Sequence, residues 1–224
     1  VDSGCTVTSV GQITNDMISF ALFHYKFNGS IILSASHNPI GYGGAKMMKE
    51  GNQTIPGDNP DLIKAVEKIE YKEGQIPKVK TLDIKKDYLK FILSFIDPKS
   101  LVKKKILLDP LFGSVGLIVK DALYGLPVDP IYLHQTADPN FGGLSEPNPL
   151  NSKIRKEAIE IAKKQKPDFG VIWDGDGDRA FFIDENGEFV NSPYSTAVLV
   201  DELFRSSNSG DLSIVGDMRT IWPI

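Results

Sequence analysis

Hydrophobic residues along the chain follow two spacings, one typical of strands and one typical of amphipathic helices. Short apolar runs predict strands, whereas apolar positions three or four residues apart predict one face of a helix. Strands are predicted at 31–33, 45–48, 106–108, 128–133, 169–173, 180–183 and 212–216. Helices are predicted at 13–24, 60–69, 84–95, 151–164 and 192–204, and a further helix that follows residues 113–116 is predicted to end at Leu123. Because the two kinds of element alternate, we expect an α/β fold with mixed sheets lying between helices.

Polar stretches without regular apolar spacing divide the chain into units. Residues 71–82 have no helical or strand pattern and contain glycine and proline, which predicts a domain boundary. The segment 185–188 is typical of a hairpin turn, and Ser192-Pro193 then predicts the start of another helix. We therefore expect three units, at residues 1–80, 81–188 and 189–224.

Composition and charge exclude some classes of partner. The 224 residues carry a net charge of −4, which argues against nucleic-acid binding, because phosphate backbones attract basic surfaces. No apolar run is long enough to span a bilayer, so we expect no membrane partner. The single cysteine, Cys5, cannot form an intrachain disulfide, which fits a cytoplasmic protein. The chain begins with Val1 rather than Met, which indicates a trimmed or partial protein, and the oligomeric state stays open.

Three aspartates alternate with glycines directly after the predicted strand 169–173. Their carboxylates would repel one another unless a cation lay between them. The glycines allow the backbone to fold tightly enough for the side chains to converge. Carboxylate oxygens suit hard divalent cations, and open α/β sheets hold ligands at the carboxyl ends of their strands. The sequence therefore predicts that Asp174, Asp176 and Asp178 bind Mg²⁺ or Ca²⁺, with a structural acidic turn as the alternative.

The same loop partly matches a calcium-binding EF-hand. Its three aspartates stand at the first three ligand positions of that motif, and Glu185 stands at the twelfth. The sixth position, which needs glycine for a sharp turn, is Arg179. The flanking segments also predict strands, whereas an EF-hand needs helices. These departures disfavour a calcium module.

A second candidate site is the loop Ser34-Ala35-Ser36-His37-Asn38-Pro39, which follows the strand 31–33, a strand we expect to be buried. A serine hydroxyl needs a base, a cation or an anion site to act as a nucleophile. His37 is adjacent to Ser36, and Lys46 lies beyond a glycine-rich stretch. Alone, the segment could be a structural turn, since a single histidine is more often structural than catalytic.

The two loops together, in this order and each after a predicted strand, resemble the α-D-phosphohexomutase family, which includes phosphomannomutase and phosphoglucomutase. The family's phosphoserine loop is similar to residues 34–39, and its metal loop is similar to residues 174–179. The similarity covers nearly the whole chain, including Asp109-Pro110 and the loop 146–149. It implies repeated α/β domains of the phosphohexomutase type: part of a first domain with the serine loop, a whole second domain with the metal loop, and the start of a third.

The resemblance also implies how the metal and the phosphoryl group are held. Ser36 would carry the phosphoryl group, and one oxygen of that phosphoserine would join the three aspartates around Mg²⁺. His37 and Lys46 would assist proton transfer and charge stabilisation at the reacting hydroxyl. Arg179 and Lys46 would contact the substrate phosphate. The enzyme would be an isomerase that interconverts hexose 1-phosphate and hexose 6-phosphate, of mannose or glucose, through a hexose 1,6-bisphosphate.

The chain also departs from the family pattern. Residues 40–45 replace the family's usual Tyr-Asn-Gly context before Lys46. The family's first strand region, sugar-reading loop and fourth, phosphate-binding domain have no counterpart, so this piece alone could be an inactive fragment that binds Mg²⁺ and sugar phosphate. The segments 146–149 and 184–187 favour phosphomannomutase/phosphoglucomutase, while Ser34-Ala35-Ser36 also resembles phosphoglucosamine mutase. We prefer the former.

Overall fold

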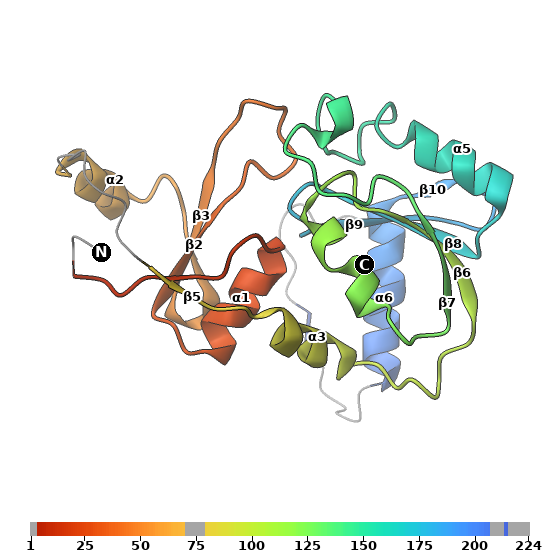
Figure 1. The fold of residues 1–224 in the computed structure, drawn as a ribbon, viewed down its shortest axis with the longest axis horizontal. Helices are drawn as coiled ribbons and strands as arrows, with labels where there is room; N and C mark the ends of the chain where they lie inside the picture. Colours follow the sequence, from red (N-terminus) through yellow and green to blue (C-terminus); the bar gives the residue numbers. More distant parts are fainter. Residues whose placement is uncertain (1–3, 70–78, 207–212, 215–224) are drawn as a thin grey trace.

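Two α/β parts lie side by side in the molecule, as Figure 1 shows. The computed structural model describes residues 4–69, 79–206 and 213–214. The smaller part contains a three-stranded antiparallel sheet in the order β2-β3-β4. The larger part contains a five-stranded mixed sheet in the order β10-β9-β8-β6-β7. The predicted α/β class is therefore confirmed.

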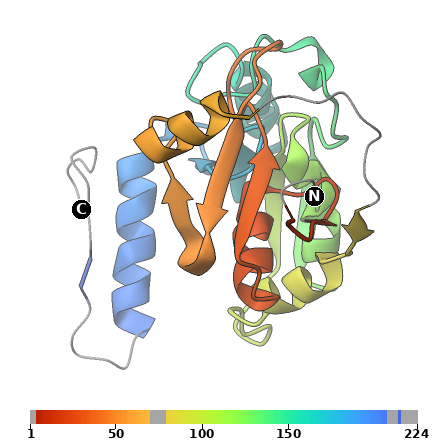
Figure 2. The same ribbon diagram turned by 90° about the vertical axis from the view of Figure 1, so that its left-hand side faces the viewer.

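The smaller part is a hairpin sheet with one helix packed on it. Its elements are α1 (Asn15–His24), β2 (Gly29–Leu33), β3 (Ala45–Lys49), the 3₁₀ turn η1 (Glu50–Asn52), β4 (Gln53–Ile55) and α2 (Pro60–Glu67). Helix α1 packs against β2 on the side that faces the larger part, and Figure 2 looks onto the three strands. Helix α2 starts at the predicted residue, because the Asn59 side chain accepts hydrogen bonds from the amides of Asp61 and Leu62.

The expectation that the strand 31–33 is buried is wrong. Ile31 is 65% exposed and Leu33 is 82% exposed, whereas Ser30 and Ile32 between them are half-buried. Side chains of a strand alternate between the two faces of its sheet, and α1 covers β2 on one face. An apolar run therefore cannot be buried throughout when its sheet is covered on a single side.

The larger sheet brings the ends of two parallel strands to one edge. Its strands are β6 (Lys104–Asp109), β7 (Val128–Tyr132), β8 (Phe169–Trp173), β9 (Ala180–Ile183) and β10 (Phe189–Val190). Strand β6 runs parallel to both β7 and β8, whereas β9 and β10 pair in antiparallel fashion. Because β6 and β8 are parallel neighbours, Asp109 at the end of β6 lies next to Ile172, near the start of the acidic loop.

Apolar side chains cover both faces of this sheet. The remaining elements of the larger part are η2 (Ser114–Leu117), α4 (Val119–Ala122), η3 (Phe141–Gly143), α5 (Lys156–Gln165) and α6 (Ser192–Ser206). On one face, Ala158 and Ala162 of α5 pack against Leu107 of β6. On the other face, the neighbouring residues Ile106 and Leu108 pack against the segment that follows β6. This alternation is that of a strand buried on both faces.

Two predicted helices differ from the observed ones. Helix α5 begins at Lys156 rather than 151, because Asn151 instead closes a turn by accepting a hydrogen bond from Lys153 N at 3.0 Å. The helix predicted to follow residues 113–116 and to end at Leu123 is reduced to α4, because Ile118 has a φ of −132°, which is not helical, and the residues before it form the 3₁₀ turn η2. The hairpin turn at 185–188 and the start of α6 at Ser192 are confirmed.

The two parts share a hydrophobic core at their junction. Strand β1 (Thr8–Ser9) pairs in parallel with β5 (Lys80–Thr81), which leads into α3 (Lys85–Leu93). Met17 and Phe20 of α1 pack against Tyr88 of α3 in one buried cluster. The domain boundary predicted at 71–82 and the strand predicted at 212–216 fall mostly outside the described residues. Within the described ranges, no helix is long and apolar enough to cross a membrane.

Candidate active site

The acidic loop 174–179 joins β8 to β9 at the edge where β6 also ends. One carboxylate oxygen from each of Asp174, Asp176 and Asp178 lies within 4.8 Å of the other two, so the three could share a metal ion. Gly177 permits the turn, because its φ of +74° lies in the left-handed region that favours glycine. The flanking strands exclude the EF-hand alternative, which needs helices on both sides.

Asp174 is the most enclosed of the three carboxylates, with 0% of the residue exposed. Arg179 neutralises it from the end of the loop, with Nε 2.8 Å and Nη2 2.5 Å from Asp174 Oδ2. Burial raises the pKa of Asp174, because desolvation of the carboxylate outweighs the attraction of Arg179. Arg179 therefore lies in the site as a partner of Asp174, and its contact with a substrate phosphate stays a prediction.

The serine loop reaches across from the smaller part and closes onto the acidic loop (Figure 1). Ser36 has a φ of +56°, a left-handed conformation that costs energy for a residue with a side chain. Its Oγ lies 3.1 Å from Asp176 Oδ1 and 3.2 Å from His37 Nδ1. At the base of the loop, Ser34 N donates to Gly44 O at 3.0 Å, which fixes where the loop leaves the sheet.

Lys46 reaches the same carboxylates from β3, where it pairs with Ile32 of β2. Its Nζ lies 2.6 Å from Asp176 Oδ2 and 2.6 Å from Asp178 Oδ2. Burial opposes the ammonium charge, but the hydrogen bonds to the two carboxylates outweigh it and raise the pKa of Lys46. Lys46 thus joins the other predicted site residues despite the unusual segment that precedes it.

Two residues that the sequence did not single out as site residues bind the acidic loop, Ser34 from the serine loop and Asn15 from helix α1. Ser34 Oγ accepts a hydrogen bond from Ser36 N at 2.8 Å and donates one to Asp176 Oδ2 at 3.0 Å. Asn15, at the start of α1, donates from its backbone to Asp176 O at 2.9 Å and from Nδ2 to Asp178 Oδ2 at 3.1 Å. The positive end of α1 thereby faces the acidic loop. A serine two positions before a turn residue is the local signal that could have indicated Ser34.

Gly175 lies where the acidic loop, the serine loop and the loop 146–149 meet. A Cβ at this position would lie 2.6 Å from Ser36 O and 2.7 Å from Pro147 Cγ. The Gly175 carbonyl accepts hydrogen bonds from Ser114 N at 3.0 Å and Ser114 Oγ at 3.3 Å. The absence of a side chain at Gly175 therefore sets how closely the two candidate loops approach.

Replacing Gly175 with alanine is expected to separate the loops. The added methyl group would overlap the Ser36 carbonyl, so the backbone must move, at a cost of about 1–3 kcal/mol in unfolding free energy. The family resemblance implies phosphorylation of Ser36 by a hexose bisphosphate, and we expect that reaction to slow by about tenfold or more, because small misplacements strongly reduce reaction rates. Intact-mass kinetics and thermal unfolding would measure both effects. Gly57→Ala is the matched control, because a Cβ there meets no atom of the described residues within 4 Å; equal effects in the two variants would refute the packing argument.

A buried acid–histidine pair supports the turn that follows β6. Asp109 has 0% exposure, and its Oδ1 accepts from Leu111 N at 2.9 Å and lies 3.0 Å from His134 Nδ1. His134 Nε2 lies 3.3 Å from Glu157 Oε2. Burial raises the pKa of Asp109 despite His134. Burial opposes the imidazolium, but the two carboxylates outweigh it and raise the pKa of His134.

Protein stability is expected to fall as pH rises through the folded-state pKa of His134. A group whose pKa is higher in the folded state stabilises the fold below its unfolded pKa, about 6.5 for histidine. That contribution is lost as the pH passes the raised value. Chemical denaturation at a series of pH values should show this slope in wild type and lose it in His134→Gln. His24→Gln, on the exposed end of α1, should keep the slope; its loss there too would contradict the assignment to His134.

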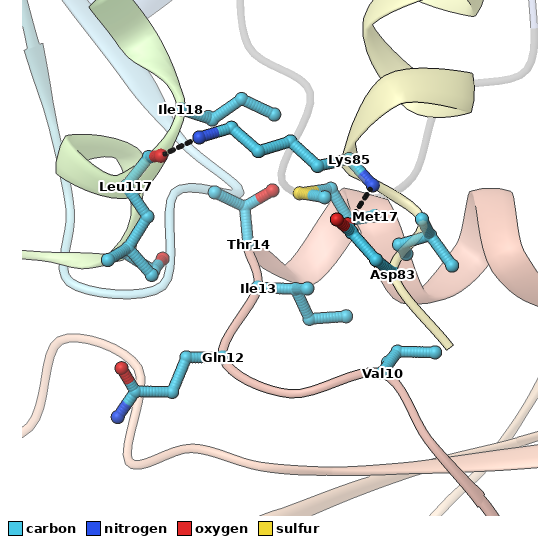
Figure 3. Close-up of a pocket in the computed structure, with 11 residues that line it drawn as sticks. Val10, Gln12, Ile13, Thr14, Met17, Asp83, Lys85, Leu117 and Ile118 are labelled. Atoms are coloured by element: carbon cyan, nitrogen blue, oxygen red, sulfur yellow. Dashed lines mark hydrogen bonds between the residues drawn. The ribbon is translucent and has the colours of Figure 1, made fainter. Parts of the chain in front are cut away.

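A pocket of about 300 Å³ lies behind the acidic loop, at the junction of the two parts (Figure 3). Its lining includes Thr14, Met17 and Leu117, and Lys85 Nζ crosses to donate to Leu117 O at 2.9 Å. Ser114 also lines this pocket and separates it from Gly175. None of the predicted site residues lines the pocket, so the candidate chemistry lies instead where the two loops meet.

Sequence models of one family match most of the chain. The phosphoglucomutase/phosphomannomutase α/β/α domain I matches residues 1–73, and domain II matches residues 86–187. A phosphomannomutase of Escherichia coli K12 is 32% identical over 233 residues, covering 99% of this chain and 50% of that protein. One from Vibrio cholerae is 29% identical, covering 99% of this chain and 49% of that protein. A crystal structure from Thermus thermophilus, assigned as a phosphomannomutase, has a TM-score of 0.78 and 26% identity, covering 90% of this chain and 47% of that one.

The fold and the meeting of the two loops define a protein of the phosphohexomutase class. The chain belongs to the phosphoglucomutase/phosphomannomutase family, as its sequence predicts. It spans about half the length of the curated relatives it matches.

Proposed function

We propose that this chain forms the phosphoryl-transfer half of a magnesium-dependent phosphohexomutase. The whole protein would interconvert hexose 1-phosphate and hexose 6-phosphate, of mannose or glucose, through a phosphoserine at Ser36 and a hexose 1,6-bisphosphate. One observation carries the proposal: Ser36 Oγ lies 3.1 Å from Asp176 Oδ1, although the residues are 140 positions apart. A phosphoryl group on Ser36 would add up to about two negative charges beside these carboxylates, so the arrangement would require a cation in the cluster.

The acidic cluster fits a hard divalent cation. Its donors are carboxylate oxygens alone, which Mg²⁺ prefers over softer ligands. Asp174, Asp176 and Asp178 would hold the ion together with an oxygen of phosphorylated Ser36. When bound, the ion would neutralise the charge that builds up on the transferring phosphoryl group.

The surrounding side chains supply the remaining requirements of phosphoryl transfer, which depends mainly on positioning and charge. In the forward step, the bond between Ser36 Oγ and phosphorus breaks, and a bond between a sugar hydroxyl oxygen and phosphorus forms. In net terms the proton of the sugar hydroxyl passes to Ser36 Oγ, and His37, whose Nδ1 lies 3.2 Å from that oxygen, can carry it. Lys46 and Arg179 provide positive charge beside the reacting phosphate. The second step reverses these events with the other phosphate of the bisphosphate.

Two readouts test the proposal in sequence. The unphosphorylated chain, incubated with Mg²⁺ and glucose 1,6-bisphosphate, should gain one phosphoryl group on Ser36 by intact mass and peptide mapping. The full-length protein should then turn over mannose 1-phosphate or glucose 1-phosphate faster than glucosamine 1-phosphate. Faster turnover of glucosamine 1-phosphate would favour a phosphoglucosamine mutase, the alternative that Ser34-Ala35-Ser36 raises. Sugar-phosphate binding without serine phosphorylation would indicate an inactive fragment and refute the proposal.

A further inference from the structure

The ammonium group of Lys46 lies among the carboxylates that are candidates for metal binding. Its Nζ is 2.6 Å from one oxygen of Asp176 and 2.6 Å from one oxygen of Asp178. Both residues belong to the cluster whose oxygens lie within 4.8 Å of one another. Lys46 therefore provides positive charge at the position where a divalent cation would provide it.

The hydrogen bonds at these two oxygens leave little room for a second cation. Each carboxylate oxygen offers about two lone-pair directions. Asp176 Oδ2 accepts from Lys46 Nζ and from Ser34 Oγ at 3.0 Å. Asp178 Oδ2 accepts from Lys46 Nζ and from Asn15 Nδ2 at 3.1 Å. A metal ion that uses these oxygens must displace a donor, and Lys46 is the donor it repels.

Removal of Lys46 from the cluster is also sterically accessible. Its side chain is 34% exposed, whereas that of Asp176 is 7% exposed. Backbone hydrogen bonds hold the other two donors in place, Ser34 N to Gly44 O at the base of the serine loop and Asn15 N, at the start of α1, to Asp176 O. The long lysine side chain can rotate away without moving either loop, because it enters the site from the neighbouring strand β3.

We propose that Lys46 and the divalent cation compete for Asp176 and Asp178, so that cation binding releases the Lys46 ammonium from the cluster. The inference rests on the proposed function, because it takes the acidic loop to be the metal site. Before the metal binds, Lys46 offsets the repulsion among the carboxylates. After it binds, the ammonium is available to a phosphoryl group on Ser36, whose Oγ is 3.1 Å from the other oxygen of Asp176. Lys46 thus lowers the affinity of its own site for metal.

Lys46→Met tests the competition, because methionine keeps a long flexible side chain without the charge. Calorimetric titration of unphosphorylated protein with MgCl₂ should show binding tighter by about tenfold or more than in wild type, since removing a nearby positive charge favours a cation. Lys49→Met, an exposed position on the same strand, should bind Mg²⁺ as wild type does. Lys46→Arg, which keeps the positive charge, should retain weak binding. A mutation that merely damaged the site would weaken binding, so the direction of the change is diagnostic.

A measurement on the unmutated site keeps the test valid if Lys46→Met folds poorly. Lysine side chains carrying ¹³C-dimethyl labels retain their charge, and the Lys46 signal can be assigned from its absence in Lys46→Arg. On adding Mg²⁺, this signal should shift with the binding curve, while that of Lys49 stays in place. A stationary Lys46 signal, or unchanged or weaker Mg²⁺ affinity in Lys46→Met, would overturn the competition while leaving the metal site intact. Absence of Mg²⁺ binding in every variant would instead refute the metal site of the proposed function, and the competition with it.

Discussion

Replacing Ser36 with alanine is expected to abolish phosphoryl transfer. The hydroxyl of Ser36 is the group that would accept and return the phosphoryl group. Ser34, the nearest serine in sequence, already uses its Oγ to bond Ser36 N and Asp176 Oδ2. We therefore expect no phosphoryl gain from glucose 1,6-bisphosphate by intact mass, and a turnover loss of about a thousandfold or more in the full-length protein.

The same substitution is expected to leave the fold intact. The left-handed conformation of residue 36 costs alanine about as much as it costs serine, because both carry a Cβ, and Ser36 is partly exposed. Ser30→Ala, on strand β2 before the serine loop, is the matched control, because it removes a buried hydroxyl that has no hydrogen-bond partner among the residues the structure describes. This control should keep phosphorylation and turnover near wild-type levels. Turnover by Ser36→Ala at a level close to that of Ser30→Ala would refute the assignment of the phosphate carrier.

Local sequence patterns predict the elements that are buried on both faces or that carry strong turn signals. Strands β8 and β9 match the predicted ranges 169–173 and 180–183, because their apolar runs are bounded by the acidic loop and a hairpin turn. The start of helix α2 is predicted by Asn59-Pro60, because a capping residue followed by proline is a local signal for the first turn of a helix. The convergence of the three aspartates could also be predicted from the sequence. The glycines between them let the backbone fold tightly, so that side chains two residues apart can meet at one cation.

Contacts between distant segments could not be predicted in the same way. The exposure of Ile31 and Leu33 depends on which face α1 covers, and a run of three apolar residues does not specify that face. The hydrogen bonds of Ser34 to Asp176 and of Asn15 to Asp178 span 142 and 163 positions, so no local spacing reveals them. The attachment of Arg179 to Asp174 follows from burial of that carboxylate, which also appears only in the folded chain.

Replacing Asp176 with asparagine is expected to abolish high-affinity metal binding. Asp176 is 5% exposed and is the carboxylate that contacts Ser36, Ser34 and Lys46 together, so its charge acts in a poorly solvated position. Loss of one negative charge beside a divalent ion should weaken Mg²⁺ binding by about 100-fold or more, as judged by calorimetric titration. Asparagine keeps the size of the side chain and one acceptor oxygen, so the hydrogen bond from Lys46 can persist.

Stability measurements separate this metal effect from damage to the fold. Without metal, Asp176→Asn should unfold at nearly the wild-type temperature, because the lost hydrogen-bond strength is offset by weaker repulsion among the carboxylates. With saturating Mg²⁺, wild type should gain stability through ligand binding, and the variant should gain almost none. Asp184→Asn, the same change in the turn after β9, should respond to Mg²⁺ as wild type does. A full Mg²⁺ response in Asp176→Asn would mean that the ion binds elsewhere, and the proposed pairing of Ser36 with a metal at the acidic loop would then be wrong.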